Sequence, residues 1–149
     1  MRLTSKGRYA VMAMTDLSVH GASGMVRLQE IAARQSISQP YLEQLFSRLK
    51  RAGLVEGVRG PNGGYRLARP AAEVSVAEVI AAVDETIATN ACRAGGAIGC
   101  TGRKERCLTH NLWAALGNRI SDFLDEVSLA DVAAGRVAPA RADRAEVRA

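Results

Sequence analysis

Apolar side chains recur at helical spacing in three stretches of the first 52 residues. The stretches are about 4–19, 28–34 and 40–52, and in each the apolar positions fall three or four residues apart, as in an amphipathic helix. The short sequence Ser-Ile-Ser at 36–38 predicts a turn between the second and third helices. Pro40 suits a first helical position, because its missing N–H has no partner there in any residue type. Two short helices joined by a tight turn predict a helix-turn-helix.

A β-hairpin is predicted directly after the third helix. Residues 54–58 and 65–68 are short strand-like stretches, and between them lies the turn sequence Arg-Gly-Pro-Asn-Gly-Gly. A hairpin in this position is the wing of a winged helix-turn-helix. The predicted fold is therefore mainly α with a small β wing.

The second half of the chain predicts two further helices. Ser75 and Glu78 form a capping-box pattern at the start of a helix over 76–85. A longer helix over 108–127 carries an apolar stripe larger than the domain itself needs. Packing against its own domain is one interpretation, and a dimerisation helix is the favoured one. The residues expected at the dimer contact are Leu112, Leu116, Ile120, Phe123, Leu124 and Val127.

Three regions follow from this pattern. Residues 1–70 form the predicted DNA-binding region, and 71–130 hold a cysteine-containing loop and the dimerisation helices. Residues 131–149 are rich in alanine and arginine without periodicity, which predicts a disordered tail.

Positive charge is concentrated in the first region. Residues 1–70 carry eleven Lys or Arg and four Asp or Glu, a net charge of +7, whereas the remainder is slightly acidic. A basic half with a helix-turn-helix predicts binding to double-stranded DNA. Glutamine and glutamate on the third helix can pair with adenine and with the cytosine amine, although any one of them could be only a solvated side chain. The expected DNA-contacting residues are Arg2, Ser38, Gln39, Tyr41, Glu43, Gln44, Arg59 and Gly60.

The three cysteines of the chain and one histidine form a candidate metal site. Cys92, Cys100, Cys107 and His110 lie in a stretch rich in glycine and arginine, which has little preferred structure of its own. Thiolates suit iron–sulfur clusters and zinc, and imidazole suits both. The spacing does not decide between an iron–sulfur cluster, a structural Zn²⁺ and a metal-free thiol sensor.

Other functional classes find less support. No apolar run approaches the roughly 20 residues needed to span a bilayer, and the first residues lack the apolar block of a signal peptide. We therefore expect a cytoplasmic protein whose thiols stay reduced. No nucleophile–base pair or phosphate loop is evident, so we do not expect an enzyme.

Five sequence motifs resemble the family of winged-helix iron–sulfur cluster regulators. They are MRLTSKGRYAV at the start, YLEQLFSRLK in the third helix, GLV-x-x-VRGPNGGY in the wing, EVI-x-AVDE before the first cysteine and CLTH-x-LW after the last. The resemblance covers about residues 1–130.

The resemblance implies a homodimeric transcription regulator, mainly a repressor of genes for iron–sulfur cluster biogenesis. It implies a [2Fe–2S] cluster, supplied by the cluster-assembly machinery, with Cys92, Cys100, Cys107 and His110 as ligands. It also implies DNA contacts from Tyr41, Glu43 and Gln44 and from Arg59 of the wing.

Overall fold

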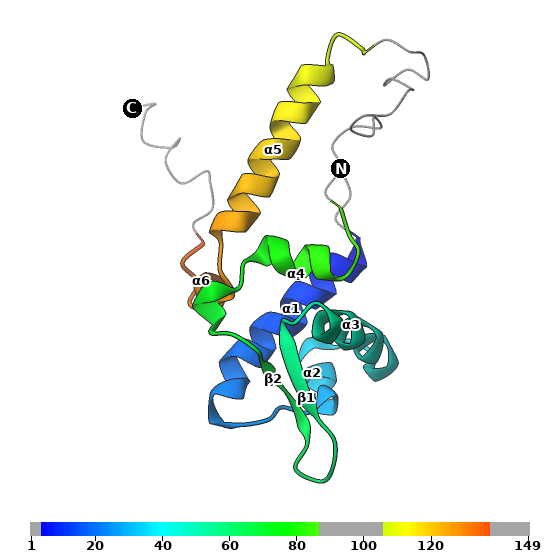
Figure 1. Cartoon of the computed structure of the whole chain (residues 1–149), viewed down its shortest axis with the longest axis vertical. Helices are drawn as coiled ribbons and strands as arrows, with labels where there is room; N and C mark the ends of the chain where they lie inside the picture. The colour runs from blue at the N-terminus through cyan, green and yellow to red at the C-terminus, as the bar shows by residue number, and fades with distance from the viewer. Residues whose placement is uncertain (1–3, 87–105, 138–149) are drawn as a thin grey trace.

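The computed structural model describes residues 4–86 and 106–137. Its central element is α1 (Ser5–His20), which contacts α2, α4 and α6 and runs through the middle of the molecule (Figure 1). Thr4 caps α1 by accepting the amide of Lys6 at 3.3 Å, as the sequence predicted for this region. The apolar side chains that predicted the helix, Ala10, Ala13, Met14 and Leu17, are all fully buried.

The predicted helix-turn-helix is present, with bounds within one residue of those expected. It consists of α2 (Leu28–Gln35) and α3 (Gln39–Arg51), and Ser36 turns the chain between them with a φ of 54°. The inner face of α3 consists of Leu42, Leu45, Phe46 and Leu49, all buried in the common core. Burial of this face fixes the opposite, polar face of α3 toward solvent.

The wing is the antiparallel pair β1 (Val55–Val58) and β2 (Gly64–Leu67), in which Val55 lies opposite Leu67. Val26 exchanges two backbone hydrogen bonds with Tyr65, at 2.9 and 2.8 Å, and so attaches the wing to the chain segment before α2. A Cβ on Gly64 would lie 2.6 Å from the carbonyl oxygen of Val26, so this close approach requires glycine. The wing is thereby held to the helices at its base.

Helix α4 (Val76–Ala82) begins at the predicted capping box but is shorter than predicted. The Ser75 hydroxyl accepts the amide of Glu78 at 3.1 Å, and the Glu78 carboxylate accepts the amide of Ser75 at 2.9 Å. The expectation that this helix reaches Glu85 is wrong, because Asp84 takes a φ of 56°. The chain leaves the helix there because the Glu85 carboxylate is bound by backbone amides of α1.

Two helices follow the undescribed segment 87–105. The long α5 (His110–Glu126) extends away from the body of the molecule, and the short α6 (Leu129–Ala133) returns to pack on α1 (Figure 1). Backbone hydrogen bonds of 2.9 Å join Val76 to Val127 and Leu129 to Val74. Helix α6 was not predicted, and it takes up the first residues of the stretch expected to be a disordered tail. Residues 138–149 of that stretch lie outside the described residues.

Two short 3-10 helices, Gly21–Ser23 and Ala71–Glu73, complete the connections. In residues 4–86 and 106–137, no helix is both long and apolar enough to cross a membrane.

Candidate nucleic-acid interface and cluster-binding segment

An open groove of about 720 Å³ lies between the start of α3 and the wing. Gln39 and Glu43 line it from α3, and Arg59 and Gly60 line it from the wing turn. These four residues were predicted to contact DNA from their sequence positions alone, and the structure brings them to the same groove. Lys50, at the other end of α3, adds a positive charge to the same wall.

The exposed face of α3 carries the side chains suited to base recognition. The amide of Gln39 donates to the Glu43 carboxylate at 3.2 Å, so the two side chains are positioned as a pair. Gln44 is exposed beside them. Ser38 precedes the helix, and its hydroxyl does not form the capping hydrogen bond that would occupy it locally.

Tyr41 lies differently from the other predicted contacts. Its ring packs edge-on against Tyr9 of α1, with centroids 5.9 Å apart and an interplanar angle of 86°, and it is only half exposed. Its ring therefore also helps to fix α3 on α1. Tyr9 was not among the predicted site residues, because no local pattern in the sequence indicates its contact with Tyr41.

The wing carries Arg59 on a turn that a side chain from outside the hairpin contacts. Arg59 is exposed, and Gly60 has a φ of 117°, a left-handed conformation that favours glycine. Arg27, just before α2, donates a side-chain hydrogen bond to the carbonyl of Pro61 in the wing turn. Sequence reasoning missed Arg27, because its contact is with a residue 34 positions away.

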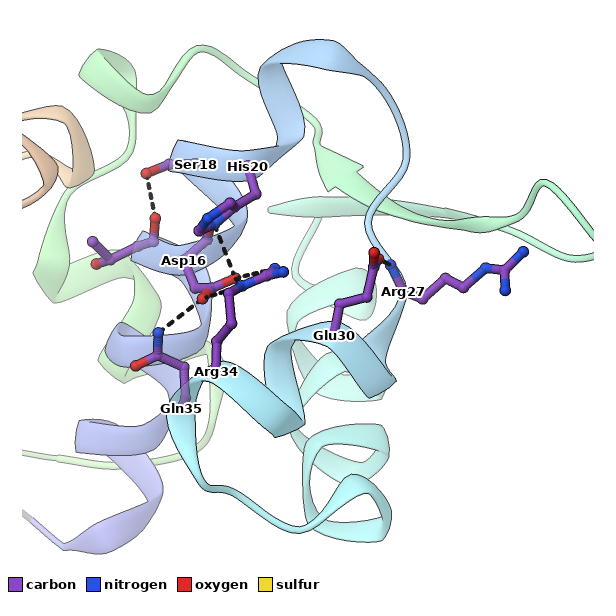
Figure 2. Close-up of polar contacts among 8 residues, drawn as sticks. Asp16, Ser18, His20, Arg27, Glu30, Arg34 and Gln35 are labelled. Atoms are coloured by element: carbon purple, nitrogen blue, oxygen red, sulfur yellow. Dashed lines mark hydrogen bonds and ion pairs between the residues drawn. The ribbon is translucent and has the colours of Figure 1, made fainter.

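A buried carboxylate on α1 holds the last turn of α2, the first helix of the helix-turn-helix, against α1. Figure 2 shows Asp16 surrounded by Arg34, Gln35 and His20. Arg34 donates from Nε to both carboxylate oxygens, at 2.9 and 3.2 Å, and from Nη2 at 2.7 Å, and Gln35 donates a fourth hydrogen bond at 2.8 Å. Burial acts to raise the pKa of Asp16, but the hydrogen bonds from Arg34 and Gln35 outweigh it, so the pKa lies below its ordinary value.

The residues just after α4 contact two parts of the DNA-binding region. Arg48 of α3 forms an ion pair with Asp84 and lies 3.5 Å from the carbonyl of Val83. The Glu85 carboxylate accepts the backbone amides of Thr4 and Gly7 at the start of α1. The segment after α4 is thus tied both to α3 and to the start of α1.

Two of the four predicted metal ligands are described, and a single backbone turn separates them. Cys107 and His110 stand at the beginning of α5, where the amide of His110 donates to the carbonyl of Cys107 at 3.0 Å. Cys92 and Cys100 lie outside the described residues, as does Arg2. Within the described residues no three potential metal ligands come together, since half of the predicted set is not among them.

The apolar stripe of α5 is exposed in the single chain. The exposed fractions are 61% for Leu112, 40% for Leu116 and 50% for Phe123, whereas Ile120 and Leu124 are half-buried. Val127, expected on the same stripe, instead follows the last turn and bonds to the start of α4. This backbone bond does not test whether the Val127 side chain contacts a partner, which stays a prediction.

The helix-turn-helix, the wing and the groove between them define a winged-helix DNA-binding protein of the transcription-regulator class. Residues 3–135 match the Rrf2 family, described as an iron-dependent transcriptional regulator. The chain belongs to this family. It is a DNA-binding transcription regulator and not an enzyme.

Proteins of similar sequence are named HTH-type transcriptional regulator IscR. Those of Serratia proteamaculans and Photorhabdus laumondii are 54% and 55% identical over 132 residues, which cover 89% of this chain and 79% of each relative.

Solved structures of the same fold include T. potens IscR, 34% identical with a TM-score of 0.72 over 91% of this chain and 88% of the other. They also include CymR, the global cysteine regulator of B. subtilis, 28% identical with a TM-score of 0.76 over 91% and 98%.

Proposed function

We propose that this regulator senses iron–sulfur cluster status through a [2Fe–2S] cluster held by Cys92, Cys100, Cys107 and His110. The observation that supports the proposal is the backbone turn from Cys107 to His110, which keeps these two candidate ligands within one turn at the entry to α5. Thiolate and imidazole are donor types that iron–sulfur clusters accept. The family description as iron-dependent and the relatives named IscR support the same cofactor.

The donor set suits a sensor better than an electron carrier. Replacing one thiolate by a neutral imidazole lowers the negative charge around the cluster and raises its reduction potential. His110 must lose its proton to act as a ligand, so occupancy should fall in acid. A site of this kind holds its cluster weakly enough to release it when clusters are scarce.

Occupancy would act on DNA through the two ends of segment 87–105. At one end lie Asp84 and Glu85, which contact Arg48 of α3 and the first turn of α1. At the other end lies α5. Ligation by Cys92, Cys100, Cys107 and His110 would link the two ends of this segment and so bias how α1 and α3 are held.

The DNA-binding surface in this proposal is the groove between α3 and the wing. Gln39, Glu43 and Gln44 would read base edges in the major groove, and Arg59 would enter the narrow minor groove beside it. Glu43 is the proposed selector, because its carboxylate is satisfied by a cytosine amine and repelled by a guanine or thymine oxygen. Its targets would be operators of cluster-biogenesis genes, regulated mainly by repression.

The active form in this proposal is a cytoplasmic homodimer that receives its cluster from the assembly machinery. The exposed stripe of Leu112, Leu116 and Phe123 would pair with the same stripe of a second copy. A two-fold dimer matches the two-fold symmetry of palindromic operators.

Two alternatives share the fold. A Zn²⁺ ion would accept the same Cys₃His set as a closed tetrahedral site. A thiol-redox regulator without metal is favoured by one specific observation, the similarity to Staphylococcus aureus CymR in its oxidized form, 31% identical with a TM-score of 0.71.

Isolation without oxygen distinguishes the three. We expect two iron and two sulfide per chain with visible absorption. Stoichiometric zinc in a colourless protein, or no metal, would contradict the proposal.

A further inference from the structure

Thr109 occupies the N-cap position of α5, yet its hydroxyl is not used as a cap. A threonine in this position usually accepts an amide two or three residues ahead. Within the described part of α5, Thr109 forms no such side-chain bond. Its Oγ1 instead lies 3.2 Å from Nε1 of Trp113 and 3.5 Å from Sγ of Cys107. The hydroxyl therefore connects the indole to the sulfur of a predicted cluster ligand.

The chemistry of the three groups fixes the direction of these hydrogen bonds. An indole nitrogen only donates, so Thr109 Oγ1 accepts from Trp113. The hydroxyl has one proton of its own to donate. A cysteine that binds metal is a thiolate with no proton, so its sulfur can only accept. Once Cys107 is a ligand, the indole of Trp113 donates to the Thr109 hydroxyl, and that hydroxyl donates to the Cys107 sulfur.

We propose that Thr109, supported by Trp113, is a positioning residue that donates a hydrogen bond to the Cys107 thiolate and raises the reduction potential of the cluster. The inference rests on the proposed function, in that Cys107 must be a cluster ligand. A hydrogen bond to a ligating sulfur stabilises the more negative, reduced state, and such bonds are among the factors that set iron–sulfur potentials. They also hold a ligand's side chain in place before metal binds.

The arrangement follows from local helical geometry. Thr109 and Trp113 are four residues apart and so lie on the same side of the helix, one turn from each other. Cys107 is two residues before Thr109, in the turn that leads into α5. The contact thus depends on residues 107–113 and does not require the undescribed segment 87–105.

Two substitutions of Thr109 separate the hydrogen bond from side-chain bulk. Thr109→Val keeps the shape and removes the hydroxyl, whereas Thr109→Ser keeps the hydroxyl and removes a methyl group. Full-length proteins loaded with cluster would be titrated with dithionite under argon, with the visible spectrum as readout. We expect valine to shift the reduction equilibrium about three- to tenfold toward the oxidised form, tenfold being about 59 mV for one electron. Serine should leave the potential near that of the parent.

A second readout does not need the cluster. Trp113 is the single tryptophan of the sequence, so its fluorescence is read without a contribution from any other indole. In cluster-free protein we expect a changed emission maximum for Thr109→Val and an unchanged one for Thr109→Ser. Identical emission in all three proteins would show that the hydrogen bond from the Trp113 indole to Thr109 is not formed. That result would overturn the proposed series of hydrogen bonds.

The outcomes distinguish the role of Thr109 from the proposed cluster binding on which it rests. Parent protein without iron and sulfide would remove the proposed function itself. Parent and valine proteins with equal cluster content and equal potential would overturn the role of Thr109 while leaving the cluster in place. Retention of cluster by the serine protein but not by the valine protein would support the inference, whereas loss in both would contradict it.

Discussion

The Glu85 carboxylate accepts the backbone amide of Gly7 at 2.5 Å, although the two residues are 78 positions apart. Its second oxygen accepts the amide of Thr4, so one buried side chain binds the first turn of α1. Burial acts to raise the pKa of Glu85, but the hydrogen bonds from Thr4 and Gly7 and the charge of Lys6 outweigh it, so the pKa is lowered. A negative charge is also favoured at a helix N-terminus. The end of α4 and the start of α1 are thereby joined.

Gly7→Ala should destabilise the protein, against the usual preference of helices for alanine. A Cβ at this position would overlap Oε2 of Glu85 and displace the carboxylate from its amides. We expect a loss of about 1 kcal/mol in the free energy of unfolding, measured with urea at fixed protein concentration. Gly21→Ala is the control, because its Cβ would meet only Leu17 at 3.7 Å.

The same substitution has the opposite sign when the carboxylate is absent. In a Glu85→Ala background, Gly7→Ala should stabilise by about 0.5–1 kcal/mol, the usual difference between glycine and alanine in a helix. If Gly7→Ala is destabilising in both backgrounds, then Glu85 is not the reason for glycine at this position.

Asp16→Asn should weaken the packing of α2 on α1 and reduce the acid sensitivity of the protein. Asp16 is 4% exposed and accepts three hydrogen bonds from Arg34, so its loss should cost about 2 kcal/mol. Because its folded pKa lies below the ordinary 3.8, its contribution is complete above about pH 4 and is lost as pH falls through the folded value. Stability measured between pH 6 and 3 should fall less steeply in the variant.

Glu56→Gln is the matched control for Asp16. Glu56 pairs with Arg66 across the wing, but both side chains are more than half exposed. Exposed ion pairs contribute little, so we expect a change below about 0.5 kcal/mol. Equal effects of the two substitutions would show that burial of Asp16 does not matter.

Much of the fold follows from local sequence patterns, and the departures have physical causes. The spacing of Leu42, Leu45, Phe46 and Leu49 predicts α3, because that periodicity depends only on which face is buried. The end of α4 could not be predicted in this way. It depends on Glu85 finding the amides of α1, a contact between residues far apart in the chain.

The same distinction applies to the candidate site. Glu43, Arg59 and their neighbours could be found from residue type and position in a recognisable motif. Arg27 and Thr109 could not, because their roles come from contacts with Pro61 and with Cys107 and Trp113 that no periodicity encodes. Helix α6 was missed because it is only five residues long and is held mainly by docking on α1.

Arg59→Ala should weaken operator binding about three- to tenfold and lower the salt dependence by about one phosphate contact. Arg66→Ala is a matched control on the same hairpin, because Arg66 is ion-paired with Glu56 and lines a different groove. Anisotropy titrations at several salt concentrations measure both quantities. Equal losses for the two arginines would remove the specific role of the wing turn.

Phe123→Asp should convert a dimer into monomers, because it places a charge on the exposed apolar stripe of α5. Loss of one buried aromatic side chain should weaken association at least tenfold, as sedimentation would show. Asn118→Asp is the control, because it adds the same charge on another side of the helix. Position 118 is five residues before Phe123, which is one full turn plus about 140° around the helix axis. A parent protein that is already monomeric would contradict this interface. Equal weakening of association by Asn118→Asp and by Phe123→Asp would also contradict it.

The most direct test of the account compares the DNA sequences chosen with and without the cluster. Cluster-loaded and cluster-free protein would each select duplexes from a random-sequence library under argon, at the same salt concentration. We predict two different consensus sites, and we predict that Glu43→Ala selects nearly the same site in both states. Identical consensus sites for the loaded and the cluster-free parent protein would contradict the claim that cluster occupancy directs this regulator on DNA.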